Sequence, residues 1–214
     1  MTNMSPRIRS AIEIVIVLGV LLAARALLSD MPYRNAYFMA VTLAVIFLIV
    51  TVSGEGRRSL GIGKPQSWKR FFAWTGVALV GTVVIGVVLY PLIASWLPAP
   101  ESTGVDVGGA DSNRIATLIL VGWFAAAFGE EVTMRGFILP RLAGILGGSG
   151  AGWILAIVVQ ATIFAVLHKS QLGMVIAGLF GLWFGLVYWR SGRMLWPVVI
   201  AHALPDTVSI LSGG

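Results

Sequence analysis

Seven stretches of the chain are apolar over lengths that cross, or nearly cross, a lipid bilayer. A spanning helix needs about 20 mostly apolar residues, and the charged residues of this chain gather mainly between such stretches. The stretches cover residues 10–28, 36–52, 71–97, 115–139, 151–168, 172–189 and 194–211. This pattern predicts an all-α fold, a polytopic transmembrane helical bundle of about seven spans.

The composition agrees with a membrane bundle. Of the 214 residues, 57% are hydrophobic and 11% charged, whereas about a quarter of a soluble domain is charged. The mean hydropathy is +0.91. The chain contains no cysteine, which excludes a thiol nucleophile, a thiolate zinc site and disulfides. No repeat or second domain is evident, so residues 1–214 are predicted to form a single membrane domain.

The basic residues indicate how the chain is oriented. Eleven of the 15 Lys and Arg fall at alternate ends of the spans: Arg7, Arg9, Arg57, Arg58, Lys64, Lys69, Arg70, Arg135, Arg141, Arg190 and Arg193. Only Arg34, Arg114 and Lys169 fall on the other side, and Arg25 lies inside the first span. By the positive-inside rule, the N-terminus is inside and the C-terminus outside. We therefore expect an integral protein of the plasma (cytoplasmic) membrane, whose pI of about 10.3 reflects contact with the lipid bilayer and not nucleic acid.

Five local features refine this topology. Arg7, Arg9 and the following apolar run resemble a signal peptide, but with six further spans we favour an uncleaved first helix. The basic, aromatic connection 55–70 suits an interfacial segment on the inner side, and the Pro-, Gly- and Asp-rich connection 98–113 suits an exposed outer loop. Pro140 should end or kink the fourth span. Gly181 and Gly185 should allow close helix packing within the bundle.

The fourth span ends in the only dense cluster of charge at membrane depth. Glu130 and Glu131 are adjacent, and Arg135 stands four residues after Glu131. Residues four apart share a helix face, so Glu131 and Arg135 can pair while Glu130 points about 100° away. The same pattern also suits an ordinary helix end at the membrane surface, but ionisable groups inside a bilayer are costly and mark functional sites.

Both histidines of the chain also fall in predicted spans. Phe164 precedes His168 by four residues and could wall its imidazole, and His202 shares a helix face with Asp206. Pro205, between them, should free the carbonyl of Ala201 and kink the helix. We expect these groups to form one polar pocket with the two glutamates.

Such a pocket has several chemical uses. A glutamate and a histidine near one water can activate it for attack on a carbonyl. Alternatively, Glu130, His168 and His202 could bind a divalent metal such as Zn, although the H-E-x-x-H signature is absent. A serine route would use Ser149 in Gly147-Gly148-Ser149-Gly150, which resembles the motif of rhomboid-type proteases; Gly and Ser are also ordinary turn residues, and we favour that interpretation.

Three motifs, in order and on separate apolar helices, resemble the CPBP family of intramembrane proteases. They are Glu130-Glu131-x-x-x-Arg135, Phe164-x-x-x-His168 and His202-x-x-x-Asp206. The family is also called the Abi or CAAX-protease-and-bacteriocin-processing family, and it includes the type II CAAX prenyl endopeptidases. The resemblance covers residues 115–211 as a catalytic core, with residues 1–114 forming three N-terminal spans.

The resemblance implies an endopeptidase acting on membrane protein or peptide substrates, CAAX-type ones included. Glu130 would be the general base and His168 its catalytic partner, while Glu131 and Arg135 would orient the site. His202 and Asp206 would stabilise the oxyanion. Since the family often has Asn in the last position and an ionised Asp cannot donate a hydrogen bond, Asp206 must be protonated or must instead orient His202. The family is commonly labelled metalloprotease; a metal-free mechanism also fits, and whether a cofactor is needed stays undecided.

One geometrical difficulty and two other functions stay open. Straight spans would put His168 about 7–10 Å nearer the outer face than Glu130. Tilt, a long fourth span or a deep loop at residues 147–150 would have to close this offset. A non-enzymatic immunity or scaffold protein could use the same groove, and buried Glu and His also form proton relays in transporters. The short chain without a repeat argues against a transporter.

Overall fold

The computed structural model describes residues 5–97, 112–168 and 170–211, and within them the regular structure is entirely helical. The predicted outer loop 98–113 lies almost wholly outside the described residues. The elements are α1 Pro6–Leu27, α2 Arg34–Val52, the 3₁₀ turn η1 Arg57–Leu60, α3 Trp68–Val83, the π-helical η2 Val84–Leu89, α4 Tyr90–Ala94, α5 Ser112–Gly122, the π-helical η3 Trp123–Glu130 and η4 Val132–Ile138, α6 Leu139–Ile145, α7 Gly150–Val166, α8 Gln171–Arg190 and α9 Trp196–Leu211.

These helices confirm the predicted transmembrane bundle. Five continuous helical runs are long and apolar enough to cross a membrane, and the longest is the 34-residue run Ser112–Ile145 that joins α5, η3, η4 and α6. Two further apolar helices, α7 and α9, are shorter, with 17 and 16 residues. Together they give the seven spans that the hydrophobic pattern predicts.

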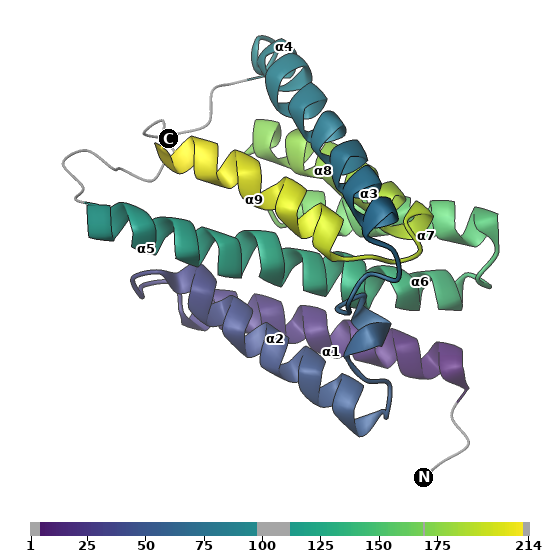
Figure 1. Ribbon diagram of the computed structural model, residues 1–214. Helices are drawn as coiled ribbons and strands as arrows, with labels where there is room; N and C mark the ends of the chain where they lie inside the picture. The colour runs from purple at the N-terminus through teal and green to yellow at the C-terminus, as the bar shows by residue number, and fades with distance from the viewer. Residues whose placement is uncertain (1–4, 98–111, 169, 212–214) are drawn as a thin grey trace.

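The long run Ser112–Ile145 is the centre of the bundle. In Figure 1 it lies between α1 and α2 on one side and α9, α3, α7 and α8 on the other. α1 packs against α2 and α6, and α9 packs against α3, α5 and η3. Buried side chains such as Ala127 and Phe137 on this run, with Val17 and Ile46 opposite, form the core. The central helix is therefore enclosed on both sides at the level of the charged motif.

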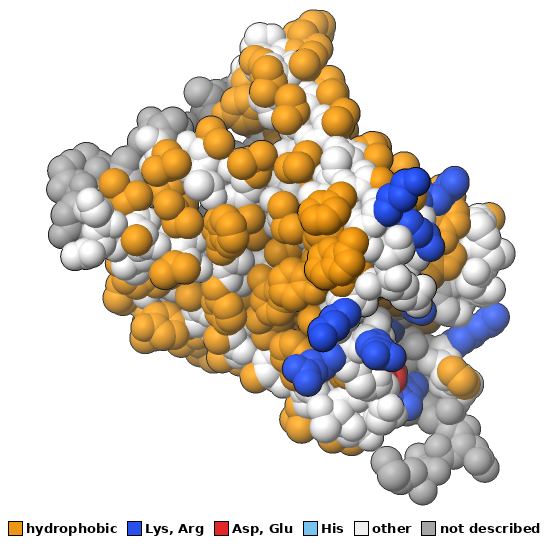
Figure 2. Space-filling model, viewed as in Figure 1, with side chains coloured by type: hydrophobic (Ala, Val, Ile, Leu, Met, Phe, Trp, Pro, Cys, Tyr) orange, Lys and Arg blue, Asp and Glu red, His pale blue; other side chains and the backbone are white. Residues whose placement is uncertain are grey.

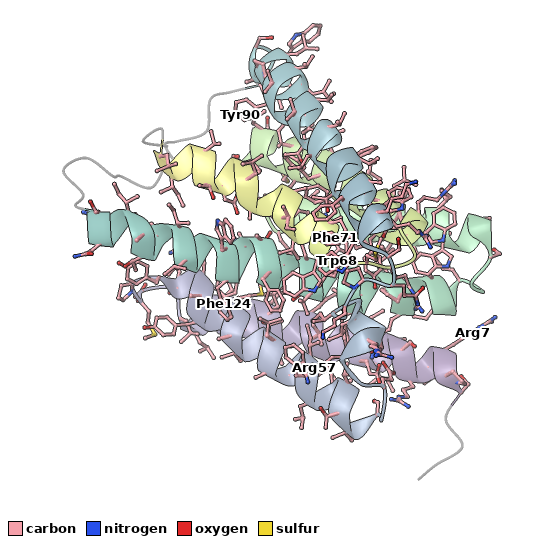
Figure 3. All side chains as sticks on the ribbon, in the orientation of Figure 1. Arg7, Arg57, Trp68, Phe71, Tyr90 and Phe124 are labelled. Atoms are coloured by element: carbon pink, nitrogen blue, oxygen red, sulfur yellow. The ribbon has the colours of Figure 1, made fainter. Side chains whose placement is uncertain are left out.

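The surface has the distribution of a membrane protein. Large apolar side chains are widely exposed, with Val52 at 70% and Trp96 at 83%. Figure 2 shows one face that is mostly apolar, with Lys and Arg gathered at one end, over η1 and the start of α3. Arg7 and Arg57 lie toward this end, whereas Tyr90 and Phe124 lie toward the other half (Figure 3). We refer to the end with η1 and the α8–α9 turn as the basic end.

Close packing of α7 on α8 depends on glycine, as the spacing predicts. A methyl group on Gly181 would lie 2.8 Å from the Cα atom of Ala161, and one on Gly185 would lie 3.1 Å from Ile157. Small residues let helix backbones approach where the bilayer supplies no hydrophobic force between helices. The predicted role of this pair within the bundle is confirmed.

Of the two alternatives predicted for Pro140, an end or a kink of the fourth span, the end is wrong. The helix continues through Pro140 to Ile145, six residues past the predicted end. The π-helical turn η4 comes immediately before it and changes the hydrogen-bond spacing there, which relieves the clash that proline makes in a regular α-helix.

Candidate active site

The Glu-Glu motif lies where two π-helical turns meet. Glu130 is the last residue of η3, Glu131 joins the two turns, and Arg135 lies in η4. Every residue of Val132–Ile138 is buried. Because π-helical turns are rare and occur mostly at functional sites, this geometry distinguishes the motif from an ordinary helix end.

Glu131 is fully buried and accepts hydrogen bonds from a guanidinium and an imidazole. Its Oε1 accepts a hydrogen bond from Arg135 Nη1 at 2.8 Å and another from His202 Nδ1 at 2.9 Å. The Glu131 and Arg135 side chains are both 0% exposed. The predicted i,i+4 pair is therefore confirmed. The spacing could not reveal the bond to His202, which joins α9 to the central helix.

Two phenylalanines of α8 complete the surroundings of Arg135. Its Nη2 donates to the carbonyl of Phe180 at 3.2 Å, and its Cζ lies 5.5 Å from the Phe184 ring centroid. Phe184 also lies against His202, with ring centroids 5.8 Å apart. Sequence reasoning missed both residues, because apolar side chains in an apolar span give no signal until their neighbours are known.

Glu130 and Asp206 face the other nitrogen of His202. Glu130 Oε2 lies 4.0 Å from His202 Nε2, and Asp206 Oδ2 lies 3.9 Å from it. Their side chains are 26% and 29% exposed, in contrast to Glu131. Because Nδ1 is held by Glu131, Asp206 does not orient the imidazole through that nitrogen; it sits beside Nε2.

Pro205 frees a carbonyl group of α9, as its position predicts. The proline leaves the carbonyl of Ala201 without its helical donor, and this oxygen accepts a hydrogen bond from Thr82 Oγ1 of α3 at 3.4 Å. Six residues further on, Trp123 Nε1 donates to Thr207 Oγ1 at 2.8 Å. These bonds fix α9 between α3 and η3, and so fix the position of His202.

His168 lies just beyond the C-terminal end of α7, outside the spanning helix. Its Nδ1 donates to the carbonyl of Phe164 at 2.9 Å, and the Phe164 ring stands edge-on to it at 5.0 Å, as predicted. Arg25, the one arginine inside the first predicted span, donates from Nη1 to the carbonyl of Leu167 at 2.7 Å. Burial lowers the pKa of His168, and the Phe164 carbonyl only partly opposes this. Since Nδ1 carries a proton, Nε2 of the neutral ring is a hydrogen-bond acceptor.

The polar groups share a groove. A cavity of about 200 Å³ is lined by Glu130, His168, His202 and Asp206 with the apolar Phe164 and Phe180. A second, of about 350 Å³, also contains Glu130 and His168, and a third, of about 340 Å³, reaches Glu130 from the side of α2 and α5. The predicted depth offset is therefore closed. Within the described chain no ion pair of 4.0 Å or less joins Glu130 to His168, although both line the same cavity.

Neither a metal site nor a serine nucleophile is evident in this geometry. In residues 5–97, 112–168 and 170–211, no three His, Asp or Glu side chains converge closely enough to hold an ion. The residues suggested for a metal, Glu130, His168 and His202, therefore do not fit one as they stand. Ser149 caps α7 by accepting from the Gly152 N–H at 3.1 Å, and Gly147 and Gly148 have φ of +88° and +68°. This stretch is a turn, as we favour from its sequence.

A scan of protein-family models agrees with this geometry. Residues 112–208 match the model described as Type II CAAX prenyl endopeptidase Rce1-like. This range contains all seven residues that the three motifs name. Searches of curated proteins and of solved structures each returned no match.

Proposed function

We propose that this membrane protein is an endopeptidase that hydrolyses membrane-associated substrates with water activated by Glu130 and His168. The match of residues 112–208 to the family model of type II CAAX prenyl endopeptidases supports this proposal. The observation that carries the proposal is the contrast between the two glutamates. Glu131 is fully buried and bonded to Arg135 and His202, whereas Glu130 is open to a groove that it shares with His168.

Glu130 is the general base in this mechanism. It takes one proton from a water in the groove while His168 Nε2 accepts a hydrogen bond from the same water. The water oxygen attacks the scissile carbonyl carbon. The tetrahedral intermediate then loses its C–N bond as Glu130 delivers the proton to the leaving nitrogen, so one water is consumed and a new carboxyl and a new amine appear.

His202 is placed to stabilise the oxyanion. Glu131 holds Nδ1 and so aims Nε2 into the groove beside Glu130 and Asp206. With protons on both nitrogens, Nε2–H donates toward the oxygen on which charge develops. Arg135 serves this step indirectly, because it holds Glu131, which holds His202.

The groove suits an extended peptide entering from the lipid. Three cavities meet at Glu130, and their walls are largely apolar. We propose membrane protein or peptide substrates, with prenylated CAAX-type peptides as one class to test. The orientation with the N-terminus inside, in the plasma membrane, is part of this proposal and is supported by the arginines and lysines of the basic end.

Cleavage of a peptide panel tests the proposed function directly. Purified protein in detergent would be incubated with membrane-anchored and prenylated peptides in H₂¹⁸O, and products identified by mass spectrometry. We expect two product peptides, with ¹⁸O in the new carboxylate, because water is the nucleophile. Since no metal step is proposed, chelators should leave the rate unchanged. Products that His168→Ala forms at the wild-type rate would contradict the role of His168, and chelator-sensitive cleavage would contradict the metal-free route.

The lowered pKa of His168 predicts the pH profile. The neutral ring accepts the hydrogen bond from water, so His168 itself should not limit activity until the pH lies below the ordinary histidine pKa of about 6.5. The contribution of His168 should be lost as the pH drops through its pKa, where Nε2 gains a proton. The measurement is kcat against pH for wild type and for His168→Gln, whose residual activity should lack this acid limb. If kcat of His168→Gln fell at the same low pH as kcat of wild type, a group other than His168 would be responsible for the fall.

A further inference from the structure

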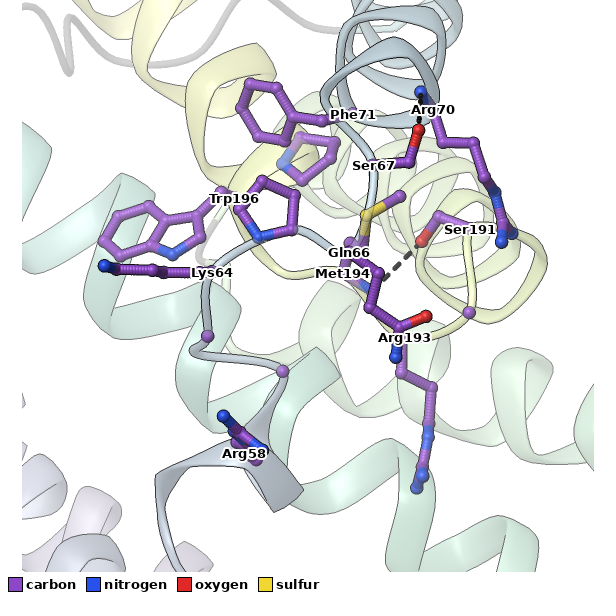
Figure 4. A pocket seen from close by; sticks show the side chains of 15 residues that line it. Arg58, Lys64, Gln66, Ser67, Arg70, Phe71, Ser191, Arg193, Met194 and Trp196 are labelled. Carbon is purple, nitrogen blue, oxygen red and sulfur yellow. Dashed lines mark hydrogen bonds between the residues drawn. The ribbon is translucent and has the colours of Figure 1, made fainter.

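A further cavity, away from the three that contain Glu130, opens at the basic end. It measures about 300 Å³ and lies between segment 63–67, the start of α3 and the 191–197 turn (Figure 4). We call it the basic pocket, defined by four cations of its lining: Arg58, Lys64, Arg70 and Arg193. No Asp or Glu lines it.

The charge of the basic pocket is not neutralised by the protein. Among the described residues, no ion pair involves any of its four cations. Two other arginines at the same end do form ion pairs. Arg141 pairs with Glu13 at 2.6 Å and with Glu55 at 3.1 Å, and Arg9 pairs with Glu13 at 2.8 Å. Four like charges brought together without a carboxylate indicate that an anion from outside compensates them.

The walls of the basic pocket are held in place by the backbone. The Leu195 N–H donates to the Gly61 carbonyl at 3.3 Å, and the Arg193 N–H donates to the Tyr188 carbonyl at 2.8 Å. Arg193 has φ of +65°, an uncommon conformation for a side-chain-bearing residue. At Gly61 a methyl group would collide with the carbonyl oxygen of Arg193. Segments about 130 positions apart in the sequence are thus joined in one fixed geometry.

An apolar groove continues from the basic pocket. It measures about 370 Å³, and its lining includes Ile62, Trp68 and Ile200, with Lys64, Phe71 and Trp196 shared between the two cavities. Trp68 is 63% exposed and Ile200 41%. Tryptophan at the end of a span is typical of the membrane interface. A cationic cavity joined to an apolar groove at this level has the polarity that a lipid headgroup and its acyl chain require.

We propose that the basic pocket binds the phosphate headgroup of an anionic phospholipid while one acyl chain lies in the adjoining apolar groove. The phosphate oxygens supply the negative charge that the protein lacks here, and arginine is suited to bind them through several N–H groups. The site is separate from Glu130, so the proposal does not depend on catalysis.

Lipid-dependent stabilisation of the full-length protein tests the site. Delipidated protein would be titrated with phosphatidylglycerol, with phosphatidylcholine of the same acyl chains, and with inorganic phosphate, following the thermal midpoint and, by native mass spectrometry, the bound lipid. Arg58→Gln/Arg70→Gln/Arg193→Gln would be compared with Arg57→Gln/Lys69→Gln/Arg190→Gln. The second set removes the same charge from neighbouring positions outside the pocket lining.

We expect wild type to prefer phosphatidylglycerol over both other ligands. Each cation near a membrane surface contributes about fivefold in affinity, so the pocket set should lose up to the order of a hundredfold and the control set much less. Ile200→Asn should weaken lipid binding with all charges kept. Equal losses in both sets, or equal binding of phosphatidylcholine, would overturn the proposal. Inorganic phosphate binding as tightly as the lipid would identify a soluble phosphate as the ligand and overturn it too.

Discussion

Glu130→Gln is expected to lower kcat by about 10²–10⁴-fold, the usual contribution of a general base, with little change in KM. Glutamine has the same shape but cannot take a proton from water. The fold should survive, because the Glu130 side chain is 26% exposed and makes no hydrogen bond to the described residues; its contact with His202 Nε2 is 4.0 Å long. The measurement is steady-state cleavage of the best peptide of the panel, with thermal unfolding as the check on folding.

Asp206→Asn is the matched control for this prediction. Asp206 lies 3.9 Å from His202 Nε2, lines the same 200 Å³ cavity and has nearly the same exposure as Glu130. Both substitutions remove one carboxylate next to the imidazole. If Glu130 acts as the base, only its variant loses about 10²–10⁴-fold in kcat, and Asp206→Asn stays within about tenfold of wild type because it removes no proton acceptor from the reaction. Equal losses would mean that both carboxylates act only through the charge of His202, and normal cleavage by folded Glu130→Gln would end the mechanism.

Arg135→Met should destabilise the folded protein by about 3–5 kcal/mol, the typical cost of leaving one partner of a buried ion pair uncompensated. Both side chains of the pair are 0% exposed, so no water replaces the lost bond. The variant also loses the bond to the Phe180 carbonyl and the contact with the Phe164 ring, 4.7 Å away. The measurement is the free energy of unfolding in mixed micelles, with cleavage activity followed in parallel.

The double variant Arg135→Met/Glu131→Gln separates charge from packing. It removes both charges and leaves an amide oxygen at position 131 as an acceptor for His202 Nδ1, so it should be more stable than Arg135→Met alone. Arg135→Lys should not restore the wild type, because an ammonium lacks the planar fork that reaches Glu131 and Phe180 together. An Arg135→Met variant within about 1 kcal/mol of wild type would show that the pair is not the support of the site that we infer.

The two predictions address different levels of one arrangement. Arg135 and Glu131 form a buried support, His202 is positioned by it, and Glu130 faces the groove with the scissile bond. A change in the support should lower stability and activity together, whereas a change in Glu130 should lower activity alone. Comparing the two variants therefore tests whether the Arg135–Glu131 pair supports the site while Glu130 acts in the reaction itself.

Much of the fold was readable from the sequence. Seven apolar stretches located the helices, since a bilayer leaves a spanning chain no alternative to internal hydrogen bonding. The i,i+4 spacing located the Glu131–Arg135 pair and placed Phe164 on His168, because contacts along one helix and at its end follow from helical geometry. The missing hydrogen bond at Pro205 followed from the chemistry of proline. Each of these is a local property that neighbouring residues determine.

Contacts between helices were decided only by the tertiary structure. Helix periodicity cannot state which helix faces which, so the bond from His202 to Glu131 and the position of Phe184 had no sequence signal. Counting residues along straight spans put His168 and Glu130 at different depths, whereas the packed helices bring both to one groove. The continuation of the helix past Pro140 depended on the π-helical turn before it. The basic pocket likewise joins segments that the sequence keeps far apart, because tertiary packing alone sets distances between residues that are distant in the chain.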